Sequence, residues 1–180
     1  DTCTIWRDAA HPEVLTDEQA KAYADTIDEK IHDPLEKAFG DWSGMDVDGD
    51  GKTAFAFYEM PYAGFFYAAD LYTKEEEPLA TGNVMDMLHM AGNNPMEVTM
   101  STLAHELQHL INFSQTFGYG DSWMNEMFSQ CAIEIAGFAS TENVYEVGAF
   151  TAKAREYGYT YPFIYEDWYV PDGEESGVPY

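Results

Sequence analysis

The spacing of apolar residues predicts a capped helix near the start of the chain. Thr16 opens the capping-box sequence T-D-E-Q, and apolar residues then recur at helical spacing as far as Ile31. Pro34 should kink or break this helix, because proline disfavours a helical residue before it. A further turn or two then ends at Gly40. The segment before this helix, 1–14, has no clear period and is expected to be irregular.

Apolar and aromatic runs bounded by turn residues predict strands in the middle of the chain. A longer apolar pattern starts near Met96 and predicts a helix that is apolar around most of its circumference, which describes a buried element. A second helix is expected to begin with Asp121 or Ser122 as its N-cap. The expected strands are Thr53–Tyr58, Gly64–Tyr72 and Val84–Met90, and a last helix is expected over Asn143–Glu156. Together these elements predict one α/β (α+β) domain over residues 1–180.

The net charge of the chain limits the classes of molecule that it can bind. The 180 residues carry a formal net charge of -25, and 46% of them are hydrophobic, which fits a folded domain with a substantial core. Such acidity argues against binding to nucleic acid or to an anionic membrane surface, because phosphates would be repelled. No apolar run in the sequence is long enough to span a membrane. We expect a monomeric, secreted protein that attracts divalent cations.

The buried helix contains the sequence H-E-L-Q-H, residues 105–109. Residues four apart lie on one face of a helix, so His105 and His109 can meet a single ion. Neutral imidazoles suit zinc, and the carboxylate of Glu106 can reach a water held on that ion without being a ligand. The alternative is a helix with histidines on a polar face, but the apolar residues around this helix argue against it.

A catalytic zinc site keeps three protein ligands and one open position, so a third ligand must come from elsewhere. The extended metzincin motif is excluded, because it would need glycine and histidine where the chain has Asn112 and Gln115. Downstream, the second predicted helix carries N-E-M-F-S at 125–129.

H-E-x-x-H followed on a second helix by N-E-x-x-S resembles the gluzincin metallopeptidases, and H-E-L-Q-H-L-I-N-F with W-M-N-E is most similar to the hyicolysin-type secreted neutral metalloproteinases. The resemblance implies that His105, His109 and Glu126 bind zinc and that Glu106 is the general base. Asp121 and Glu134 are the rival third ligands. Gln130 stands where thermolysin-like members carry an acidic residue that supports a zinc-bound histidine, so an amide oxygen or another residue would have to accept that imidazole N–H.

The same resemblance implies a zincin-like fold, with a mixed, twisted sheet over the active-site helix. The sheet-bearing upper part is expected over about 1–117, and a small, mostly helical lower part over about 118–180. The edge strand that pairs with an extended peptide substrate is expected at Gly64–Leu71.

A second chemical motif is D-V-D-G-D-G at 46–51. Alternating carboxylates around a turn that glycine permits can wrap a hard cation, so Asp46, Asp48 and Asp50 are candidate calcium ligands with a structural role. The loop is not an EF-hand, because its twelfth position is Phe57. The alternative is a solvated acidic turn.

Other residues leave alternatives open. Cys3 and Cys131 form either a disulfide or two separate buried thiols. His89 is expected to be structural. An oxyanion donor is expected among the tyrosines of the last segment, Tyr157, Tyr159, Tyr161, Tyr165 and Tyr169.

The expected function is therefore zinc-dependent hydrolysis of peptide bonds in a protein or peptide substrate. A second hypothesis is a calcium-stabilised extracellular binding or adhesion module that keeps the zincin frame without turnover. A third is zinc-dependent hydrolysis of a non-peptide amide.

Overall fold

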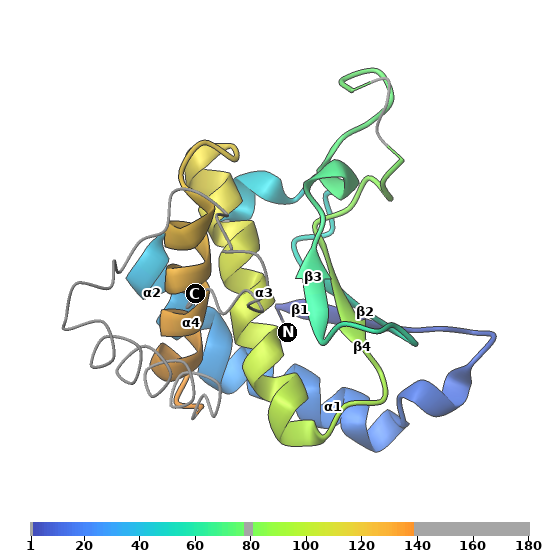
Figure 1. Ribbon diagram of the computed structural model, residues 1–180. Helices are drawn as coiled ribbons and strands as arrows, with labels where there is room; N and C mark the ends of the chain where they lie inside the picture. Colours follow the sequence, from blue (N-terminus) through green and yellow to red (C-terminus); the bar gives the residue numbers. More distant parts are fainter. Residues whose placement is uncertain (1, 78–80, 139–180) are drawn as a thin grey trace, which may run out of the picture.

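The computed structural model describes residues 2–77 and 81–138, and its centre is a four-stranded mixed sheet (Figure 1). The strands are β1 (Cys3–Arg7), β2 (Thr53–Tyr58), β3 (Gly64–Phe66) and β4 (Met87–Ala91), in the spatial order β1-β2-β4-β3. β1, β2 and β4 are parallel, and β3 runs antiparallel to β4.

The two inner strands are buried on both faces. All five residues of β4 are buried, as are Thr53, Ala54, Phe55 and Phe57 of β2. Alanine, phenylalanine, leucine and methionine dominate these strands, because buried positions on either face do not need polar side chains. β3 is an edge strand with only partly buried residues.

The first helical segment changes its pitch along its length. α1 (Asp17–Thr26) leads into one π-helical stretch (Ile27–Ile31) and then into α2 (His32–Phe39). Pro34 lies in the first turn of α2, directly after the π-helical stretch, and has no N–H to donate to the preceding turn. The helix ends at Gly40, whose φ of 108° is open mainly to glycine.

α3 (Met96–Thr116) lies between the sheet and α4 (Ser122–Ile135), with α2 packed beside both (Figure 1). Its buried leucines at 103, 107 and 110 pack in the same core as Phe55 and Leu88 of the sheet. Short 3-10 turns complete the described elements, at Pro12–Val14, Ser43–Met45 and Ala68–Leu71. The mixed α+β arrangement is compatible with the zincin-like expectation.

Most of the expected elements are present. The strand at Thr53–Tyr58, the helix start at Met96, the N-cap at Asp121 and the helix end at Gly40 are confirmed. Two expected strands are shorter, because 68–71 forms a 3-10 turn and Val84 has a φ of 56°, outside the strand region.

The expectation of an irregular amino-terminal segment was wrong in part, since Cys3–Arg7 is the parallel edge strand β1. Cys3 is buried and Cys131 is exposed, and both are free thiols. The expected helix over Asn143–Glu156 lies outside the described residues. Within 2–77 and 81–138, none of the helices combines the length and the apolar character that a membrane span requires.

The capping box of α1 supports a stability prediction. The backbone N–H of Gln19 donates to Thr16 Oγ1 at 3.2 Å, and the N–H of Thr16 donates to Gln19 Oε1 at 2.9 Å. Thr16→Ala should lower the free energy of unfolding by about 1 kcal/mol, measured by urea denaturation. Thr16→Ser keeps the capping oxygen and should leave the free energy of unfolding nearly unchanged. An equal loss of stability in both variants would exclude the cap as the cause.

Candidate metal centre

Two histidines of α3 face each other across one helical turn. The Nε2 atoms of His105 and His109 are 3.2 Å apart, and their rings are nearly perpendicular, at 82°. Both side chains are largely buried. The four-residue spacing of the motif accounts for this arrangement, because it returns the chain to the same helix face.

α4 adds a carboxylate to this pair. Glu126 Oε2 is 3.4 Å from His105 Nε2, and Glu126 Oε1 is 3.6 Å from His109 Nε2. A hydrogen bond with His105 holds the pKa of Glu126 below its usual range, and the charges of both histidines act in the same direction. One possible ligand atom from each of the three residues lies within 4.8 Å of the others.

The spacing of these donor atoms fits a tetrahedral zinc ion. With bonds of about 2.0–2.1 Å, two ligand atoms on such an ion lie about 3.3–3.4 Å apart. The separations between the three residues, 3.2, 3.4 and 3.6 Å, lie close to that value, with a different Glu126 oxygen facing each histidine. Two imidazoles and one carboxylate are also a ligand set that catalytic zinc uses. The residues present therefore fit the ion.

Hydrogen bonds from α4 orient His109. Asn125 Oδ1 can only accept, so we assign the proton to His109 Nδ1, which donates to it at 3.1 Å. The Ser129 hydroxyl lies 3.1 Å from the same nitrogen. This tautomer leaves the Nε2 lone pair directed at His105, so either a proton or a metal cation must lie between the two nitrogens. Burial is the main cause that lowers the pKa of His109, and the neighbouring His105 acts in the same direction. The lower pKa favours the neutral form, which binds metals.

Glu106 lies beside the histidines in a nearly closed environment. Its side chain is buried, and the backbone N–H of Phe66 in β3 is hydrogen-bonded to its carboxylate. Burial raises the pKa of Glu106 to about 7; His105 and the Phe66 N–H oppose the shift, and Glu126 adds to it. A carboxylate with a pKa near neutrality can both accept and donate a proton at neutral pH.

A glycine lets the edge strand approach α3 at this point. A Cβ on Gly64 would lie 2.8 Å from Thr102 Cγ2, 2.9 Å from the His89 carbonyl oxygen and 3.1 Å from Glu106 Cγ. Only glycine leaves room for this contact, and a glycine inside a strand pattern is the sequence signal for such an approach.

The rival third ligands lie elsewhere. Asp121 is exposed at the start of α4, Glu134 is exposed near its end, and neither belongs to the group formed by the two histidines and Glu126. The tyrosines expected to supply an oxyanion donor lie outside the described residues.

His89 takes part in a buried hydrogen-bond network. Its Nε2 is 2.7 Å from Asp70 Oδ2, and its Nδ1 is 3.2 Å from the hydroxyl of Tyr58. Asn83 donates to the other oxygen of Asp70 through its backbone N–H and its side chain, both at 2.8 Å. The ring of Phe65 stacks on His89. These contacts agree with a structural role, and the part played by Asp70 was missed from the sequence.

The acidic loop differs from its sequence prediction in one member. Asp46 accepts the N–H groups of Gly49 and Gly51, and Asp50 caps the N–H of Lys52. The group of possible ligand atoms within 4.8 Å consists of Asp46, Asp48 and Asp86, and Asp50 is not part of it.

Asp86 was not singled out from the sequence. Burial, with the nearby carboxylates of Asp48 and Asp46 adding to it, raises the pKa of Asp86 to about 7. An acidic residue inside the apolar run V-M-D-M-L was the available signal.

Comparison with known proteins gives one informative similarity. No protein-family model matches the chain. The chain is 32% identical over 137 residues to the neutral metalloprotease ShpI of Staphylococcus hyicus. The alignment covers 66% of this chain but 31% of that protein, so the chain spans less than a third of the relative's length. The similarity supports a relationship to metallopeptidases and nothing finer.

The contact between Asn125 and His109 supports a prediction about metal affinity. Asn125→Ala removes the acceptor that fixes the imidazole tautomer, so the zinc dissociation constant should rise about 10- to 100-fold, measured by competition with a chromogenic chelator. Met124→Ala, an exposed neighbour on α4, is the matched control and should bind zinc as the unaltered chain does. Equal affinities in both variants would show that Asn125 does not orient the ligand.

Proposed function

We propose that this chain is the catalytic part of a zinc-dependent endopeptidase, with His105, His109 and Glu126 as the zinc ligands. The observation that carries the proposal is the convergence of these three side chains from two helices, at separations of 3.2–3.6 Å. The similarity to a neutral metalloprotease independently supports metal-dependent proteolysis. Because the match covers a minor part of that protein, its substrates are not transferred to this chain.

Zinc, when bound there, supplies a Lewis acid that acidifies a coordinated water and polarises the carbonyl of the scissile bond. Glu106 is proposed to act as the general base, taking the proton of the attacking water and passing it to the leaving amine. Its burial and its raised pKa suit both halves of that transfer, and the Phe66 N–H holds its carboxylate in place.

The substrate is proposed to bind in extended form along β3. This strand is the edge of the sheet that contacts α3. Within the described part of the chain, no further strand pairs with its outer side, so the outer backbone groups are available to a bound peptide. Pairing with such an edge selects an extended peptide through its main chain. Because the strand is only three residues long, it would fix a short stretch of the substrate next to Glu106.

An extracellular location belongs to the same proposal, and the large excess of acidic residues supports it. No observation favours the non-catalytic binding module over the peptidase. The assay with and without a zinc chelator described below separates the two.

Replacing the proposed base tests the mechanism. Glu106→Gln keeps the size of the side chain but removes the proton acceptor, so cleavage of a quenched peptide library should fall by about 100-fold or more. The variant should still bind one equivalent of zinc, measured by metal analysis after gel filtration.

Two comparisons make that result decisive. Glu126→Ala should lose both zinc and activity, and chelation should abolish cleavage by the unaltered chain. Undiminished cleavage by Glu106→Gln would remove the proposed mechanism. No peptide cleavage by the zinc-loaded, unaltered chain would favour the binding module or a non-peptide amide as substrate.

Gly64 gives a separate test of the substrate edge. Gly64→Ala forces the edge strand or Glu106 to shift, so we expect cleavage to fall by up to about 100-fold with zinc affinity unchanged. The exposed Gly44 has no heavy atom within 4 Å of an added Cβ, so Gly44→Ala is the matched control. The proposal for this edge would be wrong if both variants cleaved peptides at the same rate.

A further inference from the structure

Asp86 has a buried oxygen without a partner. The residue is 2% exposed, and Oδ1 makes no hydrogen bond. The Thr53 side chain favours the charged form of Asp86, and Thr53 Oγ1 accepts from Trp42 Nε1 at 3.1 Å. The backbone carbonyl of Asp86 accepts the N–H of Ala54 in β2 at 3.0 Å, so the residue is fixed to the sheet. A buried, unpaired carboxylate oxygen is costly and calls for a compensating group.

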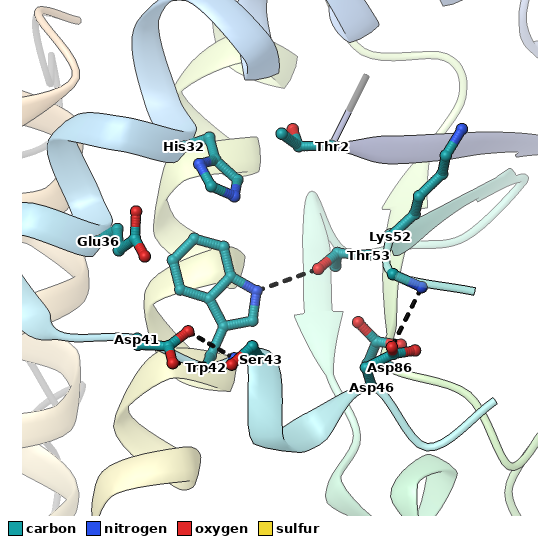
Figure 2. Close-up of a pocket in the computed structure, with 11 residues that line it drawn as sticks. Thr2, His32, Glu36, Asp41, Trp42, Ser43, Asp46, Lys52, Thr53 and Asp86 are labelled. Carbon is teal, nitrogen blue, oxygen red and sulfur yellow. Dashed lines mark hydrogen bonds between the residues drawn. The ribbon is translucent and has the colours of Figure 1, made fainter. Parts of the chain in front are cut away.

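The charged groups close to this carboxylate are also acidic. One oxygen each from Asp46, Asp48 and Asp86 lies within 4.8 Å of the others. Figure 2 shows Asp86 and Asp46 side by side, with the side chain of Lys52 extending away from them. Three carboxylates at this separation repel one another, and the loop's own lysine does not offset the repulsion.

The loop geometry holds these oxygens in place without using all their lone pairs. Asp46 accepts one backbone N–H on each oxygen, from Gly49 at 3.0 Å and from Gly51 at 3.1 Å. Each carboxylate oxygen has a second lone pair, which is free to bind a cation. The pocket beside Asp46 and Asp86 has a volume of about 200 Å³ and opens to solvent, so water can complete a coordination shell.

The donor set selects a hard cation. All three donors are carboxylate oxygens, which suit calcium or magnesium rather than zinc. Oxygens bound to one calcium ion at about 2.3–2.6 Å lie at most about 5 Å apart, which matches the spread of this group. Magnesium keeps most of its waters and is usually held by one or two carboxylates, so three carboxylates favour calcium.

We propose that Asp46, Asp48 and Asp86 form a calcium site that joins the acidic loop to the start of β4. Asp86 takes the place that the sequence pattern suggested for Asp50, whose carboxylate caps Lys52 instead. The ion neutralises the buried carboxylate and fixes the loop against the two inner strands. The site shares no ligand with the proposed zinc centre.

The test measures calcium binding directly. The chain is freed of divalent cations, given one equivalent of zinc and titrated with calcium chloride by calorimetry, and its melting temperature is measured with and without calcium. Terbium serves as a second probe, because Trp42 lines the same pocket and should sensitise its emission. We expect one saturable site and a higher melting temperature with calcium.

Asp86→Asn and Asp50→Asn are the decisive pair. Asp86→Asn keeps the shape of the side chain but removes its charge, so calcium affinity should fall by about tenfold or more and the calcium-dependent rise in melting temperature should be lost. Without calcium this variant should melt no lower than the unaltered chain, because its amide can donate to Asp46 or Asp48. Asp50→Asn should bind calcium as the unaltered chain does.

Asp48→Asn is a second disruptive variant in an exposed loop position, where folding is not at stake, and it should also weaken binding. His105→Ala should keep the calcium response, which separates this site from the proposed zinc chemistry. If Asp50→Asn lost calcium binding and Asp86→Asn kept it, the proposal would be overturned in favour of a site made by the loop alone. Absence of saturable calcium binding in the unaltered chain would overturn it altogether.

Discussion

The candidate metal centre depends on one buried hydrogen bond between α3 and α4. The Ser129 hydroxyl donates to Gln108 Oε1 at 2.6 Å, and both side chains are almost completely buried. Sliding α4 along α3 would take the donor away from the buried Gln108 Oε1, at a cost of about 1–3 kcal/mol, while the Ser129 hydroxyl could turn to the Asn125 carbonyl oxygen of its own helix, 3.1 Å away. The hydrogen bond therefore fixes how the helices are aligned. Gln108 adjoins His109, and Glu126 lies one turn before Ser129, so the same alignment brings the carboxylate opposite the histidines.

The face of α3 toward the sheet is held just as closely. Gly64 brings β3 against Thr102 and Glu106, and the Phe66 N–H reaches the Glu106 carboxylate. β3 thus covers the Glu106 carboxylate, interacts with it through the Phe66 N–H, and places the outer edge of the sheet next to it. Burial of this carboxylate and the proposed peptide-binding edge therefore have a common structural origin.

The sequence predicted those parts of the molecule that follow from local rules. The H-E-x-x-H helix, the capping box at Thr16, the glycine end at Gly40 and the N-cap at Asp121 all depend on residues within a few positions of one another. The helix interruption expected at Pro34 takes the form of a change of pitch at Ile27–Ile31, in the turn directly before the proline.

Features that depend on distant contacts were not predicted. β1 forms because its backbone pairs with β2, some fifty residues away, while its outer end stays exposed and gives no apolar period. Similarly, only the folded chain brings Asp86 next to Asp46 and Asp48. Zinc ligation by Glu126 was inferred from resemblance, and the structure adds the geometry that supports it, while the ligand roles stay a proposal.

Three buried acids show how this very acidic chain places negative charge in its interior. Asp70 is bonded through one oxygen to Asn83 and through the other to His89. Glu106 has the Phe66 N–H and the adjacent His105. Asp86 has Thr53 beside it but no hydrogen bond at Oδ1, and its nearby charged groups are carboxylates. In the first two environments groups of the protein favour the charged form, although burial still raises the pKa of Glu106 to about 7.

The third environment lacks a positively charged group. Lys52 is in the same loop, but its side chain extends away from Asp86 (Figure 2). Either a proton, given a pKa raised to about 7, or a cation bound from solution would neutralise Asp86, and the convergence of Asp46, Asp48 and Asp86 supplies the donor set for a cation. The acidity of the surface raises the local concentration of such cations and so favours the same outcome.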